Sequence, residues 1–172
     1  MRVRLGLAVL GTATATTLTL VPTAANAAPQ AADATSRTGA ASSRPVLVGA
    51  RSGWVSTGVY VERGERFSIR YRSGRWTVDS RSFPWVGPWG YSWRTDEKIF
   101  QGCKVRDDRT YGTLLGTIGR HGNIFVVGKG KRFFATRSGV IRLRINDADN
   151  CLGDNAGAVR VSVRVLEEEE PA

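Results

Sequence analysis

The sequence predicts an all-β protein, an antiparallel two-sheet sandwich of the jelly-roll kind. Short runs in which apolar and polar residues alternate recur along the chain after residue 45, and this period of two is typical of half-buried strands. Turns containing glycine, serine or proline separate these runs at close spacing, as in sandwiches and barrels. No helical periodicity of any length follows the first 27 residues. Together these three observations favour two packed sheets over any helical architecture.

Residues 1–27 are predicted to be a secretory signal peptide. Arg2 and Arg4 precede an apolar stretch at 5–21, and Ala25-Asn26-Ala27 supplies a small-residue cleavage site. We therefore expect a secreted protein without a membrane span, whose cysteines enter an oxidising compartment.

The rest of the chain divides by composition. Residues 28–45 hold no bulky apolar side chain, so they cannot form a core and are expected to be a flexible linker. Residues 46–168 are long enough for one hydrophobic core and are predicted to be a single β-sandwich domain. Residues 169–172 end the chain as an acidic tail.

The strands follow from local patterns. In residues 66–72, Phe67, Ile69 and Tyr71 alternate with arginine and serine, which predicts a strand that ends at a turn at 73–74. Similar patterns predict the other strands, at residues 46–48, 54–61, 111–119, 123–128, 133–135, 140–145 and 159–165.

Residues 83–93 form an irregular loop rich in proline, glycine and large aromatic residues. Its rings are Phe83, Trp85, Trp89, Tyr91 and Trp93. We expect most of them to plug one end of the core, while an exposed ring that stacks on a sugar is the alternative.

The last two predicted strands enclose an oxygen-rich loop. Ile141, Leu143 and Ile145 share one face of their strand, and Arg142 and Arg144 are expected on the solvated face. The loop that follows is dense in carboxylate and carboxamide groups: Asn146, Asp147, Asp149, Asn150, Asp154 and Asn155. Calcium prefers six to eight such oxygens, whereas the same residues also stabilise ordinary turns. Both interpretations fit the composition.

Cys103 and Cys151 are the only two cysteines. In a secreted chain they are expected to form a disulfide, which would tie the oxygen-rich loop to the segment around Cys103.

The net charge of +10 is carried mainly by arginines that alternate with apolar residues on the predicted strands. Such a face could meet an anionic polymer, or it could simply be solvated. A nucleic acid is an unlikely partner because no nucleic-acid-binding motif accompanies the charge.

The sequence holds no catalytic constellation, and we expect a protein that is not an enzyme. His121 is the only histidine, lies in a predicted turn and has no triad partner or zinc-ligand cluster beside it. A glycosidase pair of Asp147 with Asp96 or Glu97 would rest on no motif.

Residues 56–165 resemble the bacterial calcium-dependent galactose-binding lectins of the galactophilic PA-I type. The most specific part of the likeness is I-N-D-A-D-N-C-L-G-D-N-A-G at 145–157, which matches the metal loop of that family without a gap. Weaker pieces are T-G-V-Y-V-E-R-G-E-R-F-S-I, G-R-W, G-P-W-G and Y-G-T-L-L-G-T-I-G.

The resemblance implies a jelly roll in which one calcium ion binds sugar hydroxyls directly. Asp147 and Asn155 would be side-chain ligands, with Asp154 in place of a family asparagine. Cys151, and a residue near Asp79, would contribute backbone carbonyls. Asp147 and Asp154 would also contact the sugar.

Two departures affect the sugar site. Lys98 and Gln101 stand where the family has a sugar-contacting histidine and glutamine. Cys151 replaces a threonine, and its disulfide would narrow the space for a sugar. The sequence thus predicts a secreted, calcium-dependent, galactose-type lectin-like module, and it permits an oligomer. The alternative is an interaction domain that binds anionic polymers through its arginine-rich face.

Overall fold

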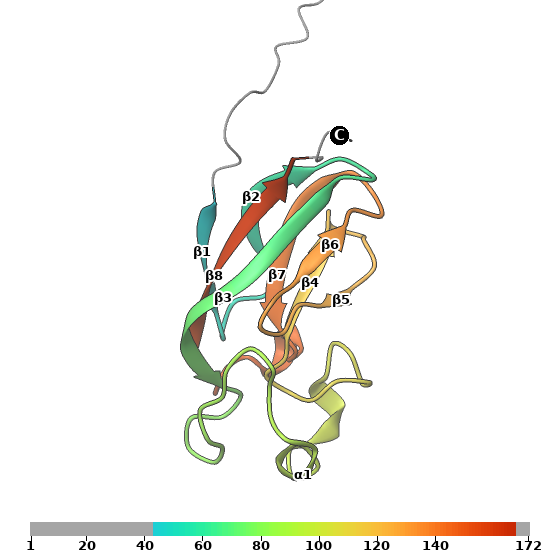
Figure 1. The fold of residues 1–172 in the computed structure, drawn as a ribbon. Helices are drawn as coiled ribbons and strands as arrows, with labels where there is room; N and C mark the ends of the chain where they lie inside the picture. The colour runs from blue at the N-terminus through green and yellow to red at the C-terminus, as the bar shows by residue number, and fades with distance from the viewer. Residues whose placement is uncertain (1–42, 168–172) are drawn as a thin grey trace, which may run out of the picture. The chain divides into compact units, whose positions relative to one another are not determined.

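The computed structural model describes residues 43–167, and these form two four-stranded antiparallel sheets (Figure 1). One sheet, sheet A, has the strand order β1-β8-β3-β6, and the other, sheet B, has the order β2-β7-β4-β5. The strands are β1 (Arg44–Gly49), β2 (Val55–Val61), β3 (Arg66–Thr77), β4 (Leu114–Ile118), β5 (Phe125–Val126), β6 (Arg132–Phe134), β7 (Gly139–Ile145) and β8 (Ala156–Leu166).

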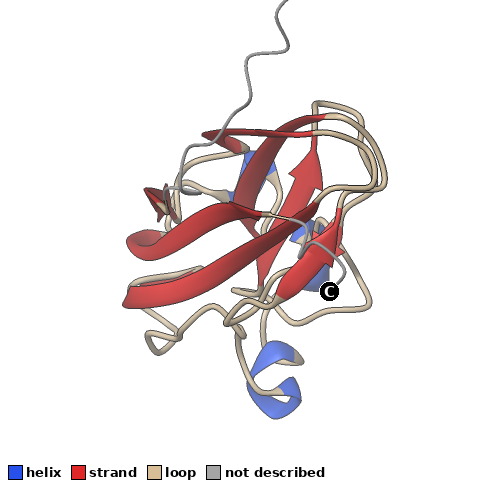
Figure 2. Cartoon of the chain, turned by 45° about the horizontal axis from the view of Figure 1, so that its top comes forward, coloured by secondary structure: helices blue, strands red, loops and turns tan. Residues whose placement is uncertain are grey.

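This strand order confirms the predicted antiparallel two-sheet sandwich. Successive strands pass from one sheet to the other except at the β4–β5 hairpin, which is the eight-stranded jelly-roll arrangement. Figure 2 shows the two layers of strands, with the short helical turns confined to the loops. These turns are α1 (Trp93–Asp96), η1 (Gln101–Cys103) and η2 (Asp149–Cys151).

The core lies between the two sheets and is built from the alternating apolar positions. Val159, Val161 and Val163 of β8 are fully buried, as are Ile141 and Leu143 of β7. At one side of the sandwich three rings pack together: Phe133 stacks on Phe67 at 5.3 Å between ring centroids, and Phe125 lies 4.9 Å from Phe133. Burial of these side chains supplies the main stabilisation of the fold.

The predicted end of the third strand at residues 73–74 is wrong. β3 continues to Thr77 through an irregularity in its pairing with β8 between Tyr71 and Ser73. Arg72 has no partner in the register, so it is the extra residue of a bulge, and Ser73 and Gly74 pair regularly with Arg160 and Val159. Gly74 has φ of 97°, and a Cβ at this position would come within 2.3 Å of the Ala158 carbonyl oxygen.

Long loops gather at one end of the sandwich. The connection from β3 to β4, which includes α1, and the connection from β7 to β8 both lie at the lower end in Figure 1. A backbone hydrogen bond from Ser80 to the Asp154 carbonyl joins the two connections.

The predicted signal peptide at 1–27, nearly all of the predicted linker at 28–45 and the tail at 169–172 lie outside the described residues. Within residues 43–167, no helix has the length and apolar character needed to cross a membrane.

Candidate functional site

Arg144, near the end of β7, holds the start of the β7–β8 loop, which comprises residues 146–155 and is the oxygen-rich loop. The alternating pattern predicts this side chain on a solvated face, but the prediction is wrong: Arg144 is 3% exposed. Its guanidinium lies over the ring of Trp54 at 5.4 Å and forms an ion pair of 2.8 Å with Asp149. It also donates to the carbonyls of Ile145 and Asp147. The arginine therefore fixes the backbone at the start of the loop.

Asn155 closes the other end of the loop and is completely buried. The Nδ2 of Asn155 donates to the carbonyl of Ala50 at 2.9 Å, and Arg51 Nε donates to the backbone carbonyl of Asn155 at 2.6 Å. These contacts fix the orientation of the amide, yet its Oδ1 has no hydrogen-bond partner among the described residues. A buried acceptor without a partner is costly, and it marks a place where a cation or polar ligand would be favourable.

Asp147 is the second buried polar group of the loop, with 2% of its surface exposed. Its pKa is raised from the usual 3.8 to about 7, mainly by burial and also by the negative charge of Asp154, whereas the neighbouring Asn155 amide opposes the rise. Among the described residues no basic side chain forms an ion pair with Asp147. The positive charge of Arg144 lowers this pKa in part, but the guanidinium bonds the Asp147 carbonyl and not the carboxylate.

The predicted disulfide between Cys103 and Cys151 is present and links residues 48 positions apart. It lies beside Asp147: an oxygen of that carboxylate and both sulfur atoms lie within 4.8 Å of one another. Because the two sulfur atoms are bonded to each other, neither is a thiolate ligand for a metal. Ala148 N donates to the Cys103 carbonyl at 2.6 Å, so the bridge and the backbone hold the two loops together.

An open pocket of about 520 Å³ lies over these residues. Its lining combines a polar set with an apolar set. The polar set comprises Asp79, Asp147, Asn150, Gly153 and Asp154 with the disulfide Cys103–Cys151, and the apolar set comprises Val78, Phe83, Ile99, Phe100 and Tyr111.

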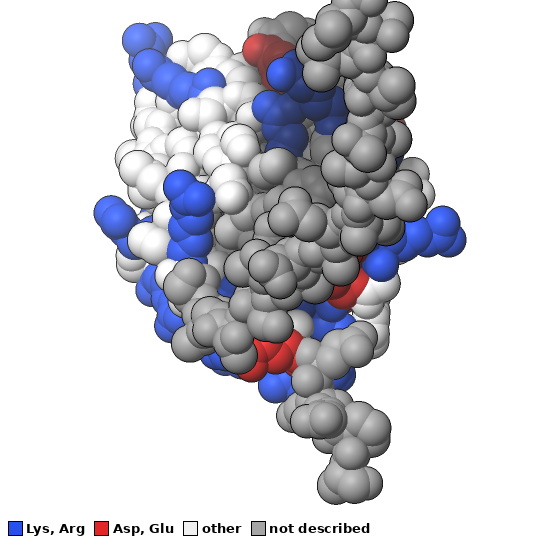
Figure 3. Space-filling view, turned by 90° about the horizontal axis from the view of Figure 1, so that it is seen from above, with Lys and Arg blue, Asp and Glu red and all other residues white. Residues whose placement is uncertain are grey.

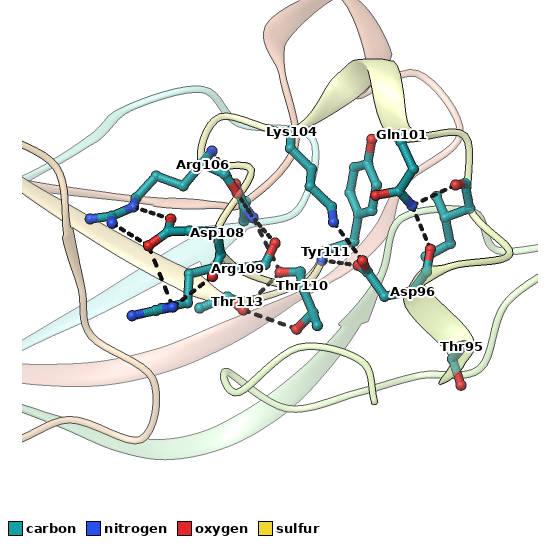
Figure 4. A network of polar contacts seen from close by, with 12 residues as sticks. Thr95, Asp96, Gln101, Lys104, Arg106, Asp108, Arg109, Thr110, Tyr111 and Thr113 are labelled. Atoms are coloured by element: carbon teal, nitrogen blue, oxygen red, sulfur yellow. Dashed lines mark hydrogen bonds and ion pairs between the residues drawn. The ribbon is translucent and has the colours of Figure 1, made fainter. Parts of the chain in front are cut away.

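Ile99, Phe100 and Tyr111 of the apolar set lie on a segment that a polar network holds in place (Figure 4). Asp96, 2% exposed, accepts a hydrogen bond from Tyr111 N and forms an ion pair with Lys104. The Tyr111 hydroxyl donates to the Phe100 carbonyl at 2.6 Å and accepts from Cys103 N. These contacts fix the segment from α1 to Tyr111 next to the oxygen-rich β7–β8 loop.

Asn146 connects this segment to β7. It is fully buried. Its Oδ1 accepts from the backbone N–H groups of Val105 and Arg106, and its Nδ2 donates to the carbonyls of Arg106, Arg109 and Thr110. The asparagine next to Asp147 is therefore a structural anchor for the neighbouring loop.

The predicted metal ligands meet at the pocket. Asp79, Asp147, Cys151 and Asp154 line it, and Asn155 is buried next to Asp147. The Asp79 carbonyl accepts hydrogen bonds from Thr77 Oγ1 at 2.9 Å and from Phe83 N at 3.1 Å. A direct bond from this carbonyl to a metal would therefore replace one of these two.

Of the four predicted sugar contacts, Asp147 and Asp154 line the pocket and the other two do not. Lys98 and Gln101 are exposed and lie outside the pocket lining, while Ile99 and Phe100 between them contribute to it. Gln101 uses its Nε2 to donate to the carbonyls of Asp96 and Ile99, which leaves its Oε1 as the atom for further contacts.

Phe100 is a site residue that the sequence alone does not identify. Its ring is 78% exposed at the pocket. A Cβ at residue 102 would come within 2.5 Å of this ring, so glycine there leaves room for it. The only available signal was an aromatic residue in an otherwise polar segment.

The expectation that most rings of the 83–93 loop plug the core is wrong. Phe83 and Tyr91 pack on the core, but the three tryptophans, Trp85, Trp89 and Trp93, are 47–58% exposed. The rings of Trp85 and Trp89 lie close over Gly157 and Gly128, where the absence of a side chain gives a flat backbone surface.

The donor set fits a hard cation. Two carboxylates, a buried amide oxygen without a partner and backbone carbonyls are the ligand types that calcium takes. The sulfur atoms are excluded by their disulfide, so the site offers oxygen alone.

The fold is similar to solved lectin structures. The N-terminal domain of EclA, described as a PllA-like lectin, is 24% identical, with a TM-score of 0.55 over 71% of this chain and 95% of that chain. AJLec from the sea anemone Anthopleura japonica is 14% identical, with a TM-score of 0.39 over 70% of this chain and 91% of that chain. No family model and no curated protein matches the sequence. The likeness to the EclA domain supports the two-sheet fold.

Proposed function

We propose that this domain is a secreted, calcium-dependent carbohydrate-binding module of the lectin type, without catalytic activity. The observation that carries the proposal is the unpartnered Oδ1 of Asn155, fully buried beside the buried Asp147 carboxylate. Two such groups without a cation are unfavourable in a protein interior. A divalent ion would satisfy both.

Asp147, Asp154 and Asn155 would hold the calcium through their side chains, and Cys151 through its carbonyl. The carbonyl of Asp79 is a further candidate, subject to the exchange of one hydrogen bond. Calcium accommodates up to eight oxygen ligands, so a bound ion could accept sugar hydroxyls in place of water.

The apolar part of the pocket lining suits a sugar ring. A pyranose such as galactose has a face of C–H groups that packs on aromatic rings, and Phe100 offers such a ring at the pocket. Galactosides are therefore the proposed ligands. From outside the lining, Lys98 would act as a donor, and Gln101 Oε1 as an acceptor, to hydroxyls at the outer edge of the sugar.

Three further points support this function. The oxygen-rich β7–β8 loop resembles the metal loop of galactophilic lectins, and the similar EclA domain is described as a lectin. The predicted signal peptide supports secretion. The sequence supplies no catalytic constellation.

Isothermal titration of the protein with methyl galactoside and methyl glucoside, each with calcium and with EDTA, tests the proposal. We expect the galactoside to bind only with calcium. Asp154→Ala should weaken the binding of both calcium and sugar, because both use this carboxylate. Asp107→Ala, which removes an exposed carboxylate outside the pocket lining, is the control. Galactoside binding that persists in EDTA would contradict a shared metal–sugar site.

A further inference from the structure

A second candidate site lies on the outer face of sheet A. Outward positions on three adjacent strands carry arginines: Arg66, Arg70, Arg72, Arg132, Arg160 and Arg164. The pairing places Ser68 opposite both Arg132 and Arg164, and Arg70 opposite Ser162. Small hydroxyl residues thus separate the basic ones and leave their guanidinium groups accessible.

The loop from β5 to β6 turns part of this face into a groove. Residues 127–131 run along β3, where Ile69 N donates to the Lys131 carbonyl at 3.1 Å and Tyr71 N to the Lys129 carbonyl at 2.9 Å. Gly130 has φ of 97°, and a Cβ there would come within 1.9 Å of the Ile69 carbonyl oxygen. Only glycine permits this close approach, so the groove is fixed by the backbone.

The groove has a volume of about 340 Å³ and is lined by Arg70, Tyr71, Arg72, Lys129, Gly130, Lys131 and Arg132. Five of these seven residues are basic and none is acidic. Of all ion pairs within residues 43–167, none involves a groove residue. Within residues 43–167, the five basic side chains donate a single hydrogen bond, from Arg72 Nε to Ser162 Oγ at 2.9 Å.

This concentration of charge is not explained by folding. Lys131 Nζ lies 5.4 Å from the centre of the Phe133 ring, but none of the five cations has an ion-pair partner among the described residues. Cations without such partners around one groove repel each other, and nearby anions would relieve the repulsion. At the end of the molecule shown in Figure 3, several blue Lys and Arg side chains project from the described residues, and smaller red acidic patches lie beside some of them.

The geometry points to a binding groove for an anionic glycan that carries sulfate or phosphate groups. Arginine presents a planar fork of donors that matches tetrahedral oxyanions. Alternate residues on a strand are about 7 Å apart and neighbouring strands about 4.8 Å apart, so several oxyanions of one polymer can be bound together.

A nucleic acid fits the groove less well. Single-stranded sites commonly stack bases on aromatic side chains. The only ring in the lining is that of Tyr71, which is half-buried and whose hydroxyl donates to the Gly74 carbonyl. Since the groove shares no lining residue with the pocket of the β7–β8 loop, its binding does not rest on calcium.

Fluorescence anisotropy in EDTA, at low and at raised salt, tests this site. The probes are a sulfated heparin-type hexasaccharide, its desulfated form, a phosphorylated mannan fragment and a twelve-nucleotide oligothymidine. We expect the sulfated or the phosphorylated glycan to bind most tightly, and the stronger of the two identifies the preferred oxyanion. Raised salt should weaken this binding.

Lys129→Gln/Lys131→Gln should reduce the affinity about tenfold, because charge-assisted hydrogen bonds are lost. Arg94→Gln/Arg120→Gln removes the same charge from exposed positions outside the groove and should bind like the wild type. Arg70→Gln is a second groove variant, for use if the double variant does not fold.

Equal losses in the groove variant and the charge-matched control would show only a net-charge effect and overturn the proposal. Unchanged binding in both groove variants, or binding of the desulfated hexasaccharide as tightly as the sulfated one, would also overturn it. Tightest binding of oligothymidine would assign the groove to nucleic acid instead.

Discussion

Replacing Asp147 by asparagine should stabilise the calcium-free protein at pH 8. The side chain is 2% exposed, and burial raises its pKa to about 7 from the usual 3.8. The pKa of Asp147 is higher in the folded protein than in the unfolded chain, so its protonation favours the folded state. This contribution to the free energy of unfolding is complete only below about pH 4, where the group is protonated in both states. That contribution is lost as the pH rises to about 7. The difference of about three pKa units, at ~1.4 kcal/mol each, is on the order of 4 kcal/mol. Asparagine keeps the shape and removes the charge.

Thermal unfolding followed by circular dichroism measures this effect. In EDTA, the wild type should unfold at a lower temperature at pH 8 than at pH 5, and Asp147→Asn should show much less dependence on pH. For a domain of this size, 1 kcal/mol corresponds to about 4 °C, so a difference of about 10 °C or more is expected at pH 8.

Calcium should remove most of the difference in stability between the two proteins at pH 8. At a concentration about 1,000 times the dissociation constant, a ligand of the folded state adds ~4 kcal/mol, and this gain is expected for the wild type alone. Asp107→Asn, an exposed carboxylate outside the pocket lining, should respond like the wild type. A calcium response retained in Asp147→Asn, or an EDTA-treated variant no more stable than the wild type at pH 8, would refute the reasoning.

Three further perturbations probe the surroundings of the pocket. Phe100→Ala should weaken galactoside binding about fivefold to tenfold, through loss of ring stacking, without changing calcium affinity in a titration; weakened calcium binding would show a structural role instead. Cys103→Ser/Cys151→Ser should lower the unfolding free energy by about 4 kcal/mol in the chain-entropy view of a 48-residue loop, measured by calorimetry, and an unchanged melting temperature would contradict it. Asn146→Ala should cost about 3 kcal/mol or more in urea unfolding, because it removes one partner from five backbone groups, of which only the Arg106 and Thr110 carbonyls keep another among the described residues. A loss below 1 kcal/mol would show that water replaces the asparagine.

The alternation of residues predicted most of the sheet because inward positions between two layers must be apolar. It failed at Arg144, since a period of two identifies which side of the sheet a residue faces and not what covers that side. Trp54, from the segment before β2, lies over this arginine. It failed again at Ser73-Gly74, because serine and glycine occur in turns and also in strands that continue past a bulge, here at Arg72.

The candidate site was predictable where its residues are close in sequence. Asp147, Cys151, Asp154 and Asn155 lie within nine residues, so their spacing is visible as a motif. Phe100 comes from the long connection between β3 and β4, where no periodicity indicates which side chain faces the pocket. Its role depends on a hydrogen-bonded loop whose path no local pattern specifies.

The position of β8 determines when the molecule can fold. β8 is the final strand in sequence but lies between β1 and β3 in sheet A, and within the described residues β1 has no other strand partner. A chain that stops before residue 156 retains every strand of sheet B, but leaves β1 unpaired and β3 with only the three-residue β6. Pairing between such distant segments is slow, so β1 can join the sheet only after β8 is in place. The oxygen-rich loop directly precedes β8, and the step that completes the sandwich therefore also closes the loop into its final geometry.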